Sequence, residues 1–445
     1  MSRSLTFKGG IHPEYCKEKS ICEPLREAPL PKTVIVPLSQ HIGAPNIPVV
    51  KKGDAVEEGD VVGKSDSFIS SPVHSSVSGK VLDIKKAFHP AMGPVMSVFI
   101  ERDETKLPRI YEIKNTLENL SADEIIEKVR SAGTVGMGGA AFPTHVKLSV
   151  PAGKKIDTLI INGAECEPYL TCDQVLMEKK TKEILLGVRI ARRILKPDRI
   201  FISVEDNKKA DILAFQKVLK ELGPDISSGV SVVPLKTKYP QGGEKQLIKA
   251  ITGREVPPGK LPLDVGCVVQ NVGTMNAIYE AVIMEKPLIE RIITVSGDCV
   301  SKCGNYVARV GTTIKDLVEL CGIEMRTEPY KIIAGGPMMG VAQTSMDAPI
   351  LKSTSGILFL SDKAARTYSE QNCIRCAKCV DVCPMMLTPT DIMRNVKKER
   401  WDKAEELNIL DCMECGSCSY VCPARIPLVQ YIKEGKTVLA RMKRA

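Results

Sequence analysis

Residues 373–384 read Cys373-Ile-Arg-Cys376-Ala-Lys-Cys379-Val-Asp-Val-Cys383-Pro384, and residues 412–423 read Cys412-Met-Glu-Cys415-Gly-Ser-Cys418-Ser-Tyr-Val-Cys422-Pro423. Both stretches have the C-x2-C-x2-C-x3-C-P spacing that holds a [4Fe–4S] cluster. The first three cysteines of such a motif wrap around one cube, and the fourth points away and ligates the other cube. The doubled motif therefore predicts a two-cluster ferredoxin domain.

Crossed ligation assigns four cysteines to each cluster. One cluster takes Cys373, Cys376, Cys379 and Cys422, and the other takes Cys412, Cys415, Cys418 and Cys383. Helical spacing at 391–396 and 402–407, between the motifs, favours the helical variety of this domain. Two structural zinc ions are the alternative, but zinc sites rarely have a third cysteine at two-residue spacing and a following proline.

The bulk composition is that of a soluble protein with several domains. The chain has 445 residues, too long for one ordinary core, with 43% apolar and 26% charged residues. No apolar run approaches the roughly 18 to 20 residues of a membrane span. Residues 1–8 lack the apolar region of a secretory signal. We therefore expect no transmembrane segment and, despite 16 cysteines, no disulfide framework.

The net charge of +9 is spread along the chain, with a local concentration in residues 433–445. We interpret this excess as a solvated surface that ends in a basic tail. Nucleic-acid binding is not expected, because aromatic residues make up only 4% and no basic stretch interleaves with them.

Three further patterns precede the cysteine motifs. Residues 288–360 form short strands and turns around one helix near 313–321, as in a small β-grasp domain. Apolar strands alternate with helices between 158 and 235, which predicts a mainly parallel α/β sheet. Residues 31–105 look like the barrel-sandwich fold of lipoyl carriers, without the hairpin that bears their modified lysine.

A helix expected at 121–132 is followed by a glycine-rich loop, which reads Gly133-Thr-Val-Gly136-Met-Gly138-Gly139-Ala-Ala-Phe142-Pro-Thr-His145-Val-Lys147. Such loops let backbone N–H groups approach a phosphate or a flat ring closely. The pattern is not a dinucleotide fingerprint, because it follows a helix and not a strand, and it lacks the Gly-Lys-Ser/Thr of a Walker loop. It predicts a ligand-binding loop without naming the ligand.

Three later segments help to identify the ligand of this loop. They read Asn162-Gly-Ala-Glu165-Cys166-Glu167-Pro168, Tyr239-Pro-Gln-Gly-Gly-Glu244 and Val269-Gln270-Asn271-Val-Gly-Thr274. In this order, the loop and the segments resemble the FMN- and NADH-binding subunit of respiratory complex I. The chain differs from that subunit where it has Met137, Ala141, Gly243 and Gln270 in place of an arginine, a glycine, a glutamate and an asparagine.

A closer resemblance, to the RnfC family of the Rnf complex, covers nearly the whole chain. It adds the segments Gly9-Gly-Ile-His-Pro and Pro37-Leu-Ser-Gln-His-Ile-Gly-Ala-Pro, the barrel-sandwich domain and both cysteine motifs. The expected fold is multidomain α/β. Its parts are an N-terminal arm (1–30), a barrel-sandwich, lipoyl-like domain (31–110), an α/β FMN/NADH-binding domain (111–287), a small β-grasp (SLBB) domain (288–360), a helical two-[4Fe–4S] ferredoxin domain (361–432) and a basic tail (433–445).

The resemblance also implies which residues contact each cofactor. The implied FMN contacts are Gly136, Gly138, Gly139, Lys147, Asn162, Gln270, Asn271 and Thr274. The residues implied to line the nicotinamide side are Phe142, Glu165, Glu167 and Glu244. No catalytic acid or base is expected, because hydride transfer to a flavin requires none.

A nicotinamide exchanges a hydride, whereas a [4Fe–4S] cluster exchanges one electron, so FMN between NAD(H) and two clusters is a suitable converter. The resemblance implies an NADH-dependent oxidoreductase subunit that passes electrons between ferredoxin and NAD. It also implies a peripheral position on the cytoplasmic face of the cell membrane. The implied partners are the membrane-embedded and ferredoxin-like Rnf subunits, with ion translocation in the membrane subunits.

Two alternatives remain, the first within the oxidoreductases and the second from another functional class. One is a soluble relative, such as the cobalamin reductase of diol-utilising microcompartments, which shares the flavin loop and the cluster motifs. The segment at 40–45 and the N-terminal domain favour the Rnf complex. The other is a structural adaptor that has lost its flavin, and the intact loop glycines and eight motif cysteines argue against it.

Overall fold

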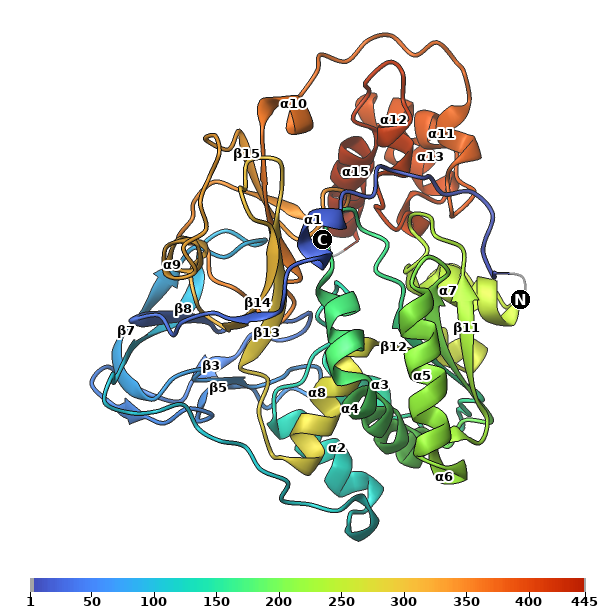
Figure 1. The fold of residues 1–445 in the computed structure, drawn as a ribbon. Coiled ribbons are helices and arrows are strands. Elements are labelled where there is room, and N and C mark those ends of the chain that lie inside the picture. Colours follow the sequence, from blue (N-terminus) through green and yellow to red (C-terminus); the bar gives the residue numbers. More distant parts are fainter. Residues whose placement is uncertain (1–3, 444–445) are drawn as a thin grey trace.

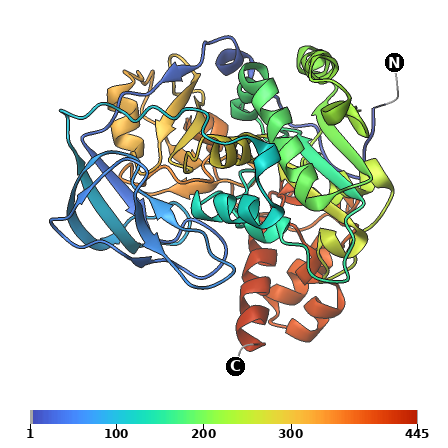
Figure 2. The same cartoon turned by 90° about the horizontal axis from the view of Figure 1, so that it is seen from below.

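The computed structural model describes residues 4–443, so Arg444 of the predicted basic tail lies outside the described residues. An α/β domain stands beside a barrel-sandwich domain and a β-grasp domain, and a helical domain lies at one end (Figure 1). Seen from below, the helical domain protrudes from the rest (Figure 2). Among the described helices, none combines the length and the apolar character needed to cross a membrane.

A parallel sheet forms the centre of the α/β domain. Its strands lie in the order β11–β10–β9–β12, and each neighbouring pair is parallel. The strands are β9 (Thr158–Gly163), β10 (Arg199–Glu205), β11 (Val230–Leu235) and β12 (Cys267–Asn271). The residues of β9 and β12 are buried on both faces, as in strands that helices cover on both sides. The predicted parallel α/β sheet is confirmed.

Helices cover both faces of this sheet. They are α4 (Cys172–Leu195), α5 (Lys209–Glu221), α6 (Pro224–Ser227), α7 (Glu244–Thr252) and α8 (Val272–Ile283), with 3-10 turns at Leu117–Asn119 and Pro262–Val265. The helix expected at 121–132 is α2 (Ala122–Ser131), which begins at a capping box of Ser121 and Glu124. The glycine-rich loop connects α2 to the short helix α3 (Thr144–Leu148).

The barrel-sandwich domain consists of two small sheets. One has the order β2–β8–β7–β4 and the other β3–β5–β6. The strands are β2 (Thr33–Pro37), β3 (Ile47–Pro48), β4 (Ala55–Val56), β5 (Val61–Lys64), β6 (Val73–His74), β7 (Gly79–Ala87) and β8 (Val95–Arg102). Inward-facing aliphatic side chains, Val34 and Ile100 among them, form a core of their own. This domain is confirmed as predicted.

The β-grasp domain has the strand order β1–β14–β13–β17–β15–β16. Its elements are β13 (Glu290–Ser296), β14 (Gly304–Arg309), α9 (Ile314–Leu320), β15 (Lys331–Ala334), β16 (Val341–Gln343) and β17 (Gly356–Leu360). The N-terminal arm supplies the edge strand β1 (Arg26–Glu27), after the single turn α1 (Glu18–Ile21). The sequence did not predict β1, because two residues are too few for an alternating pattern.

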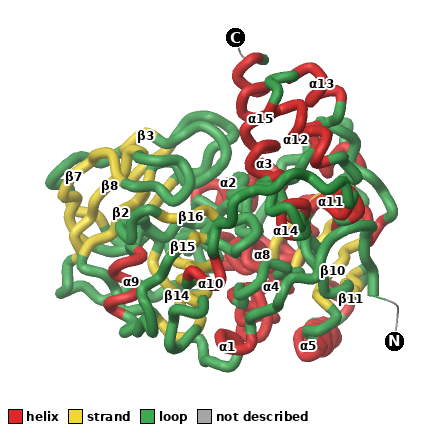
Figure 3. The backbone as a smooth tube through the Cα atoms, turned by 90° about the horizontal axis from the view of Figure 1, so that it is seen from above, coloured by secondary structure: helices red, strands yellow, loops and turns green. Residues whose placement is uncertain are grey.

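The cysteine motifs lie in the helical domain, as predicted (Figure 3). Its elements are α10 (Asp362–Ala365), α11 (Lys378–Asp381), α12 (Pro389–Lys397), α13 (Trp401–Glu406), a 3-10 turn (Ile409–Asp411), α14 (Ser417–Tyr420) and α15 (Leu428–Met442). Residues 433–442, predicted as a basic tail, continue α15. They do so because Gly435 and Leu439 pack into the domain, and a Cβ on Gly435 would lie 2.6 Å from Val396.

Candidate flavin and iron–sulfur sites

The glycine-rich loop closes on itself and bends toward the first turn of α8. The Gly136 amide donates to the Phe142 carbonyl at 2.8 Å. The Met137 amide donates to Thr274 Oγ1 at 3.1 Å. The loop therefore lies beside a helix N-terminus, where backbone N–H groups and the helix dipole favour an anion such as a phosphate.

Two adjacent glycines leave open space on this loop. A Cβ on Gly138 would meet Asn271 only at an ordinary 3.4 Å, and a Cβ on Gly139 would meet nothing within 4 Å. Gly139 has a φ of +132°, which side chains rarely adopt. One residue before Asn271, Gln270 has a buried Nε2 with no hydrogen-bond partner among the described residues. An open loop surface and an unpaired donor at the end of the neighbouring strand β12 fit a flat polar ligand such as FMN.

Two asparagines at strand ends hold the surrounding loops. Asn162, in β9, donates to the Gly242 carbonyl at 3.0 Å and accepts from the Ala164 amide at 3.0 Å. Asn271, at the end of β12, caps α8 and donates to Asp173 Oδ2 at 2.7 Å. Both side chains shape the carboxyl edge of the sheet, where parallel α/β folds bind ligands. Their direct contacts with FMN stay predictions.

The structure brings together two predicted site residues that are far apart in the sequence. Lys147 Nζ, on α3, lies 2.8 Å from Glu244 Oε1, at the start of α7, and also donates to the Val269 carbonyl at 3.1 Å. Their side chains are 29% and 39% exposed. An ion pair this exposed contributes less than about 1 kcal/mol, so a ligand that binds either side chain can replace it.

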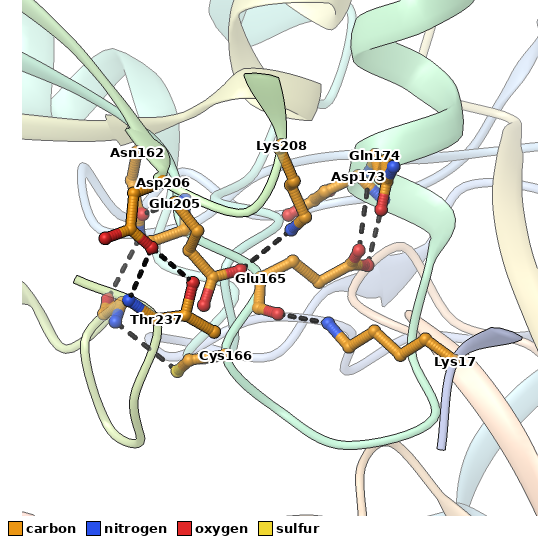
Figure 4. A network of polar contacts seen from close by, with 12 residues as sticks. Lys17, Asn162, Glu165, Cys166, Asp173, Gln174, Glu205, Asp206, Lys208 and Thr237 are labelled. Atoms are coloured by element: carbon orange, nitrogen blue, oxygen red, sulfur yellow. Dashed lines mark hydrogen bonds and ion pairs between the residues drawn. The ribbon is translucent and has the colours of Figure 1, made fainter. Parts of the chain in front are cut away.

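Glu165, directly after β9, caps the N-terminus of α4. Its carboxylate accepts from the amides of Asp173 and Gln174 at 2.9 and 3.4 Å (Figure 4). Its carbonyl accepts from the buried Lys17 of the N-terminal arm. The carboxylate is thus engaged with the protein's own backbone, and its place on the nicotinamide side stays a prediction.

Glu167 joins the α/β domain to the β-grasp domain. Its carboxylate accepts from the amides of Met338 and Met339 at 3.0 and 2.9 Å. Burial raises the pKa of Glu167 to about 7, although these two amides and Lys17 act to lower it. The residue predicted to face the nicotinamide therefore also fixes a domain junction.

We expect Glu167→Gln to change how stability depends on pH. The folded pKa of about 7 lies above the ordinary value of 4.5. The folded chain therefore holds the proton more tightly, and this stabilisation, about 3 kcal/mol at most, is lost as the pH rises through 7. Between about pH 5 and about pH 8, the apparent Tm of the wild type should fall relative to that of Glu167→Gln. Parallel Tm profiles in thermal scans would contradict this expectation.

A buried ion pair at the end of β10 was not predicted from the sequence. Lys208 Nζ lies 2.8 Å from Glu205 Oε2, and both side chains are 1% exposed (Figure 4). Burial lowers the pKa of Lys208, but the carboxylates of Glu205 and Glu165 outweigh it and shift the pKa upward. Breaking such a pair is costly, so it fixes the turn after β10. Three charged residues at the end of a strand, Glu205, Asp206 and Lys208, were the available signal.

The two cysteine motifs fold into matching loops. In the first, the Arg375 amide donates to Cys373 Sγ at 3.4 Å, and in the second, the Glu414 amide donates to Cys412 Sγ at 3.4 Å. The corresponding φ angles are +56° at Arg375 and +60° at Glu414. The shared backbone path and N–H···S contacts indicate that both loops are built to hold the same kind of group.

The inner cysteine set, Cys383, Cys412, Cys415 and Cys418, lines one cavity. Burial, together with the charges of the other three cysteines, raises the pKa of the Cys418 thiol to about 12. Thiolates are the form that ligates a metal, and clustered buried thiolates need a compensating positive charge. The iron of a cluster supplies that charge, so the residues present fit an iron–sulfur cluster.

The outer cysteine set is Cys373, Cys376, Cys379 and Cys422. Three of its members pack in one apolar cluster that also contains Cys418 of the inner set, so the two sets are neighbours. Cys376, the remaining member, is exposed. This grouping is compatible with crossed ligation, which stays a prediction.

The two sets differ in their surroundings. Over the inner set, Tyr239 of the α/β domain donates its hydroxyl to the Cys415 carbonyl at 2.8 Å, and Gln246 donates to the Pro384 carbonyl at 3.4 Å. The loop of the outer set is open, with Ile374 69% exposed beside the exposed Cys376. The inner set therefore faces the α/β domain, and the outer set faces solvent.

The fold and these sites define a flavin- and iron–sulfur-binding oxidoreductase subunit, and family models agree. The RnfC barrel sandwich hybrid domain matches residues 5–105, and the Nuo51 FMN-binding domain matches 129–280. The SLBB domain matches 292–342, and the 4Fe-4S dicluster domain matches 366–423. The predicted four-domain fold class is confirmed.

Two relatives match over nearly their full lengths. The chain is 47% identical to the C subunit of the proton-translocating ferredoxin:NAD(+) oxidoreductase complex of Clostridium ljungdahlii, over 97% of this chain and 93% of that protein. It is also 47% identical to the C subunit of the Na(+)-translocating ferredoxin:NAD(+) oxidoreductase complex of Acetobacterium woodii, over 99% and 98%. The chain belongs to the RnfC family of the Rnf complex, as the sequence resemblance predicted.

A solved structure shares the fold at low identity. The crystal structure of an NAD+-reducing [NiFe]-hydrogenase in its H2-reduced state matches with a TM-score of 0.52 and 19% identity. The match covers 74% of this chain and 67% of the hydrogenase chain. It extends the fold to a protein outside the Rnf family.

Proposed function

We propose that this chain passes electrons between NAD(H) and the other subunits of an ion-translocating ferredoxin:NAD oxidoreductase complex, using FMN and two [4Fe–4S] clusters. One observation carries the proposal. Within one chain, the hydrogen bond between Tyr239 Oη and the Cys415 carbonyl joins the flavin-binding domain directly to a cysteine set that fits a cluster. When bound, the flavin exchanges a hydride with nicotinamide and single electrons with iron–sulfur clusters.

The chain's own residues hold and orient these groups. The loop at 136–139 and the N-terminus of α8 hold the flavin and its phosphate, and Gln270 offers its unpaired Nε2 as a donor. Lys147 provides a positive charge at the same edge. The inner and outer cysteine sets each hold one cluster, with Cys383 and Cys422 exchanged between the motifs.

Phe142 and Glu244 have the positions best suited to nicotinamide. Glu244 is partly exposed, and its single ion pair is weak enough to exchange for a ligand. Phe142 is half-buried at the end of the glycine-rich loop. Glu165 and Glu167 shape the edge beside them through their bonds to backbone amides. Hydrogen bonding and stacking, without proton transfer from a side chain, are sufficient to orient a hydride donor.

The outer set is the point of exchange with a partner. Its loop carries Arg375 and Lys378 at the positions where the inner loop has Glu414 and Ser417. An exposed basic rim around a ligand loop attracts an acidic electron carrier and speeds its approach. We infer that this carrier is a ferredoxin-like subunit of the complex. The chain then stands on the cytoplasmic face of the cell membrane, beside the membrane-embedded subunits.

The test is an anaerobic titration of the reconstituted chain with NADH, followed by flavin absorbance and by the EPR signals of the clusters. NADH is expected to reduce the flavin and then clusters that contain about eight iron atoms per chain. Glu244→Gln should weaken NADH binding about tenfold to a hundredfold, the cost of one charged hydrogen bond, and retain FMN and iron. An unreduced flavin in the wild type would refute the function, and an unchanged midpoint in Glu244→Gln would remove that residue from the site.

A further inference from the structure

The segment Gly9-Gly10-Ile11-His12-Pro13 has no role in the sites described above. It lies in the N-terminal arm, which runs along the helical domain on the side of the α/β domain (Figure 1). The Gly10 amide donates to the Val382 carbonyl at 2.9 Å. Ile11 and Tyr239 exchange backbone hydrogen bonds of 2.8 and 2.9 Å. The segment therefore touches the residue before Cys383 and the α/β domain at the same point.

Glycine is required at both positions of this segment, because the backbone of the arm lies very close to the backbones of two other segments. A Cβ on Gly9 would lie 2.9 Å from the Cys383 carbonyl oxygen, and a Cβ on Gly10 would lie 2.7 Å from the Tyr239 carbonyl oxygen. Their φ angles are +84° and +82°, in the region that favours glycine. No side chain fits between the arm and the two segments it joins.

Two consecutive residues of the α/β domain complete this junction. Lys238 Nζ donates to the Gly9 carbonyl at 2.9 Å. Tyr239 is 1% exposed, and its hydroxyl donates to the Cys415 carbonyl at 2.8 Å. Tyr239 thus contacts the arm through its backbone and the inner cysteine set through its side chain.

The other contacts near the inner set include an apolar cluster, in which Cys166 and Met338 pack with Met413 and Cys415. The covalent connection of the helical domain to the β-grasp domain, residues 361–372, is exposed over most of its length. Gln246 adds hydrogen bonds of 3.4 Å to the Pro384 carbonyl and 3.2 Å to Met385 Sδ. The arm and Tyr239 supply shorter hydrogen bonds, which reach the backbone of both halves of the inner set, at Val382 next to Cys383 and at Cys415.

We propose that Gly9, Gly10 and Tyr239 are positioning residues that set the distance between the inner cysteine set and the flavin loop. This inference rests on the proposed function, because it assumes a flavin on the loop and a cluster in the inner set. Electron transfer between fixed centres slows steeply as they move apart, and small misplacements in an active site cost large factors in rate. A junction of short hydrogen bonds to backbone groups, one of them from the buried Tyr239 hydroxyl, is suited to holding that distance.

The test compares the wild type with the variants Tyr239→Phe and Gly10→Ala. Each is the full chain, reconstituted with FMN and iron–sulfur clusters. Gly53→Ala is the matched control, because Gly53 also has a positive φ and no atom within 4 Å of its Cβ position. In both test variants, NADH should reduce the flavin at the wild-type rate. Electron transfer from the flavin to the clusters should be at least about tenfold slower than in the wild type. The EPR signal of the inner cluster should shift, and that of the outer cluster should not.

Amide hydrogen exchange supplies a readout that does not depend on turnover. Faster exchange at residues 9–12 in Gly10→Ala, and around Cys415 in Tyr239→Phe, supports the proposal. Wild-type exchange, EPR and cluster reduction in Tyr239→Phe would overturn it, even where Gly10→Ala fails to fold. Failure of NADH to reduce the wild-type flavin would refute the proposed function instead, and the exchange and EPR data would still decide whether the junction positions the inner set.

Discussion

Gly138→Val is expected to remove FMN from the protein and to leave both clusters in place. The new side chain fits the chain itself, because Gly138 is exposed and its Cβ position is 3.4 Å from the nearest atom. It would occupy the surface of the loop on which the flavin is proposed to lie. Overpacking of about 1 to 3 kcal/mol corresponds to binding weakened about tenfold to a hundredfold. A titration of the flavin-free variant with FMN measures this loss.

Two controls separate this effect from general damage. Ala152→Val enlarges an exposed side chain outside the flavin loop, at a residue without a positive φ, and should retain FMN. Gly138→Ala adds one methyl group and should give an intermediate affinity. Iron content and the thermal unfolding profile should match the wild type in all three variants. Full flavin occupancy in Gly138→Val would show that the loop surface is not the flavin site.

Cys383→Ala is expected to remove the cluster of the second motif, although Cys383 belongs to the first motif. The structure places Cys383 with Cys412, Cys415 and Cys418 around one cavity. Iron should fall from about eight to about four atoms per chain, because each cube holds four. Cys412→Ala should give the same EPR spectrum as Cys383→Ala. The surviving cluster, in the outer set with its exposed Cys376, should be the one that a chelator removes quickly.

Cys422→Ala is the reciprocal variant. It should remove the outer cluster, match Cys379→Ala in its spectrum and leave a cluster that resists the chelator. Ligation within each motif predicts the opposite pairing, in which Cys383→Ala matches Cys379→Ala. The pairs of spectra therefore distinguish crossed from sequential ligation without any assumption about redox potentials.

Much of the fold could be predicted because its signals are local. The cysteine spacing identified the two-cluster domain, and the apolar run at 158–162 predicted the strand that the structure has at Thr158–Gly163. Ser121, a suitable N-cap residue, and the acidic Asp123 and Glu124 after it marked the start of α2. The resemblance to a known family supplied the order of the domains. These features depend on neighbours within a few residues, which is the range that pattern reasoning covers.

The remaining features depend on contacts between distant segments. Nothing near Lys17 in the sequence indicates that it reaches the carbonyl of Glu165. The hydrogen bonds of Glu167 to the β-grasp domain could not be predicted either. The donors are the backbone amides of Met338 and Met339, and almost any residue at those positions would provide the same amides. The sequence does not show which backbone donors a side chain will meet. The contacts of Glu165 and Glu167 could therefore be recognised only in the structure.

The junction at Tyr239 has a consequence for how the chain is made. Gly10 and Ile11 are synthesised well before the backbone groups with which they pair, at Val382 and Tyr239. Domains fold as units during synthesis, so the barrel-sandwich and α/β domains can form while the arm is still unpaired. The pairing of the arm with Leu235 and Tyr239 needs only the α/β domain, whereas its contact with Val382 needs the helical domain. The contact between the arm and the inner set is therefore the last part of the junction to form.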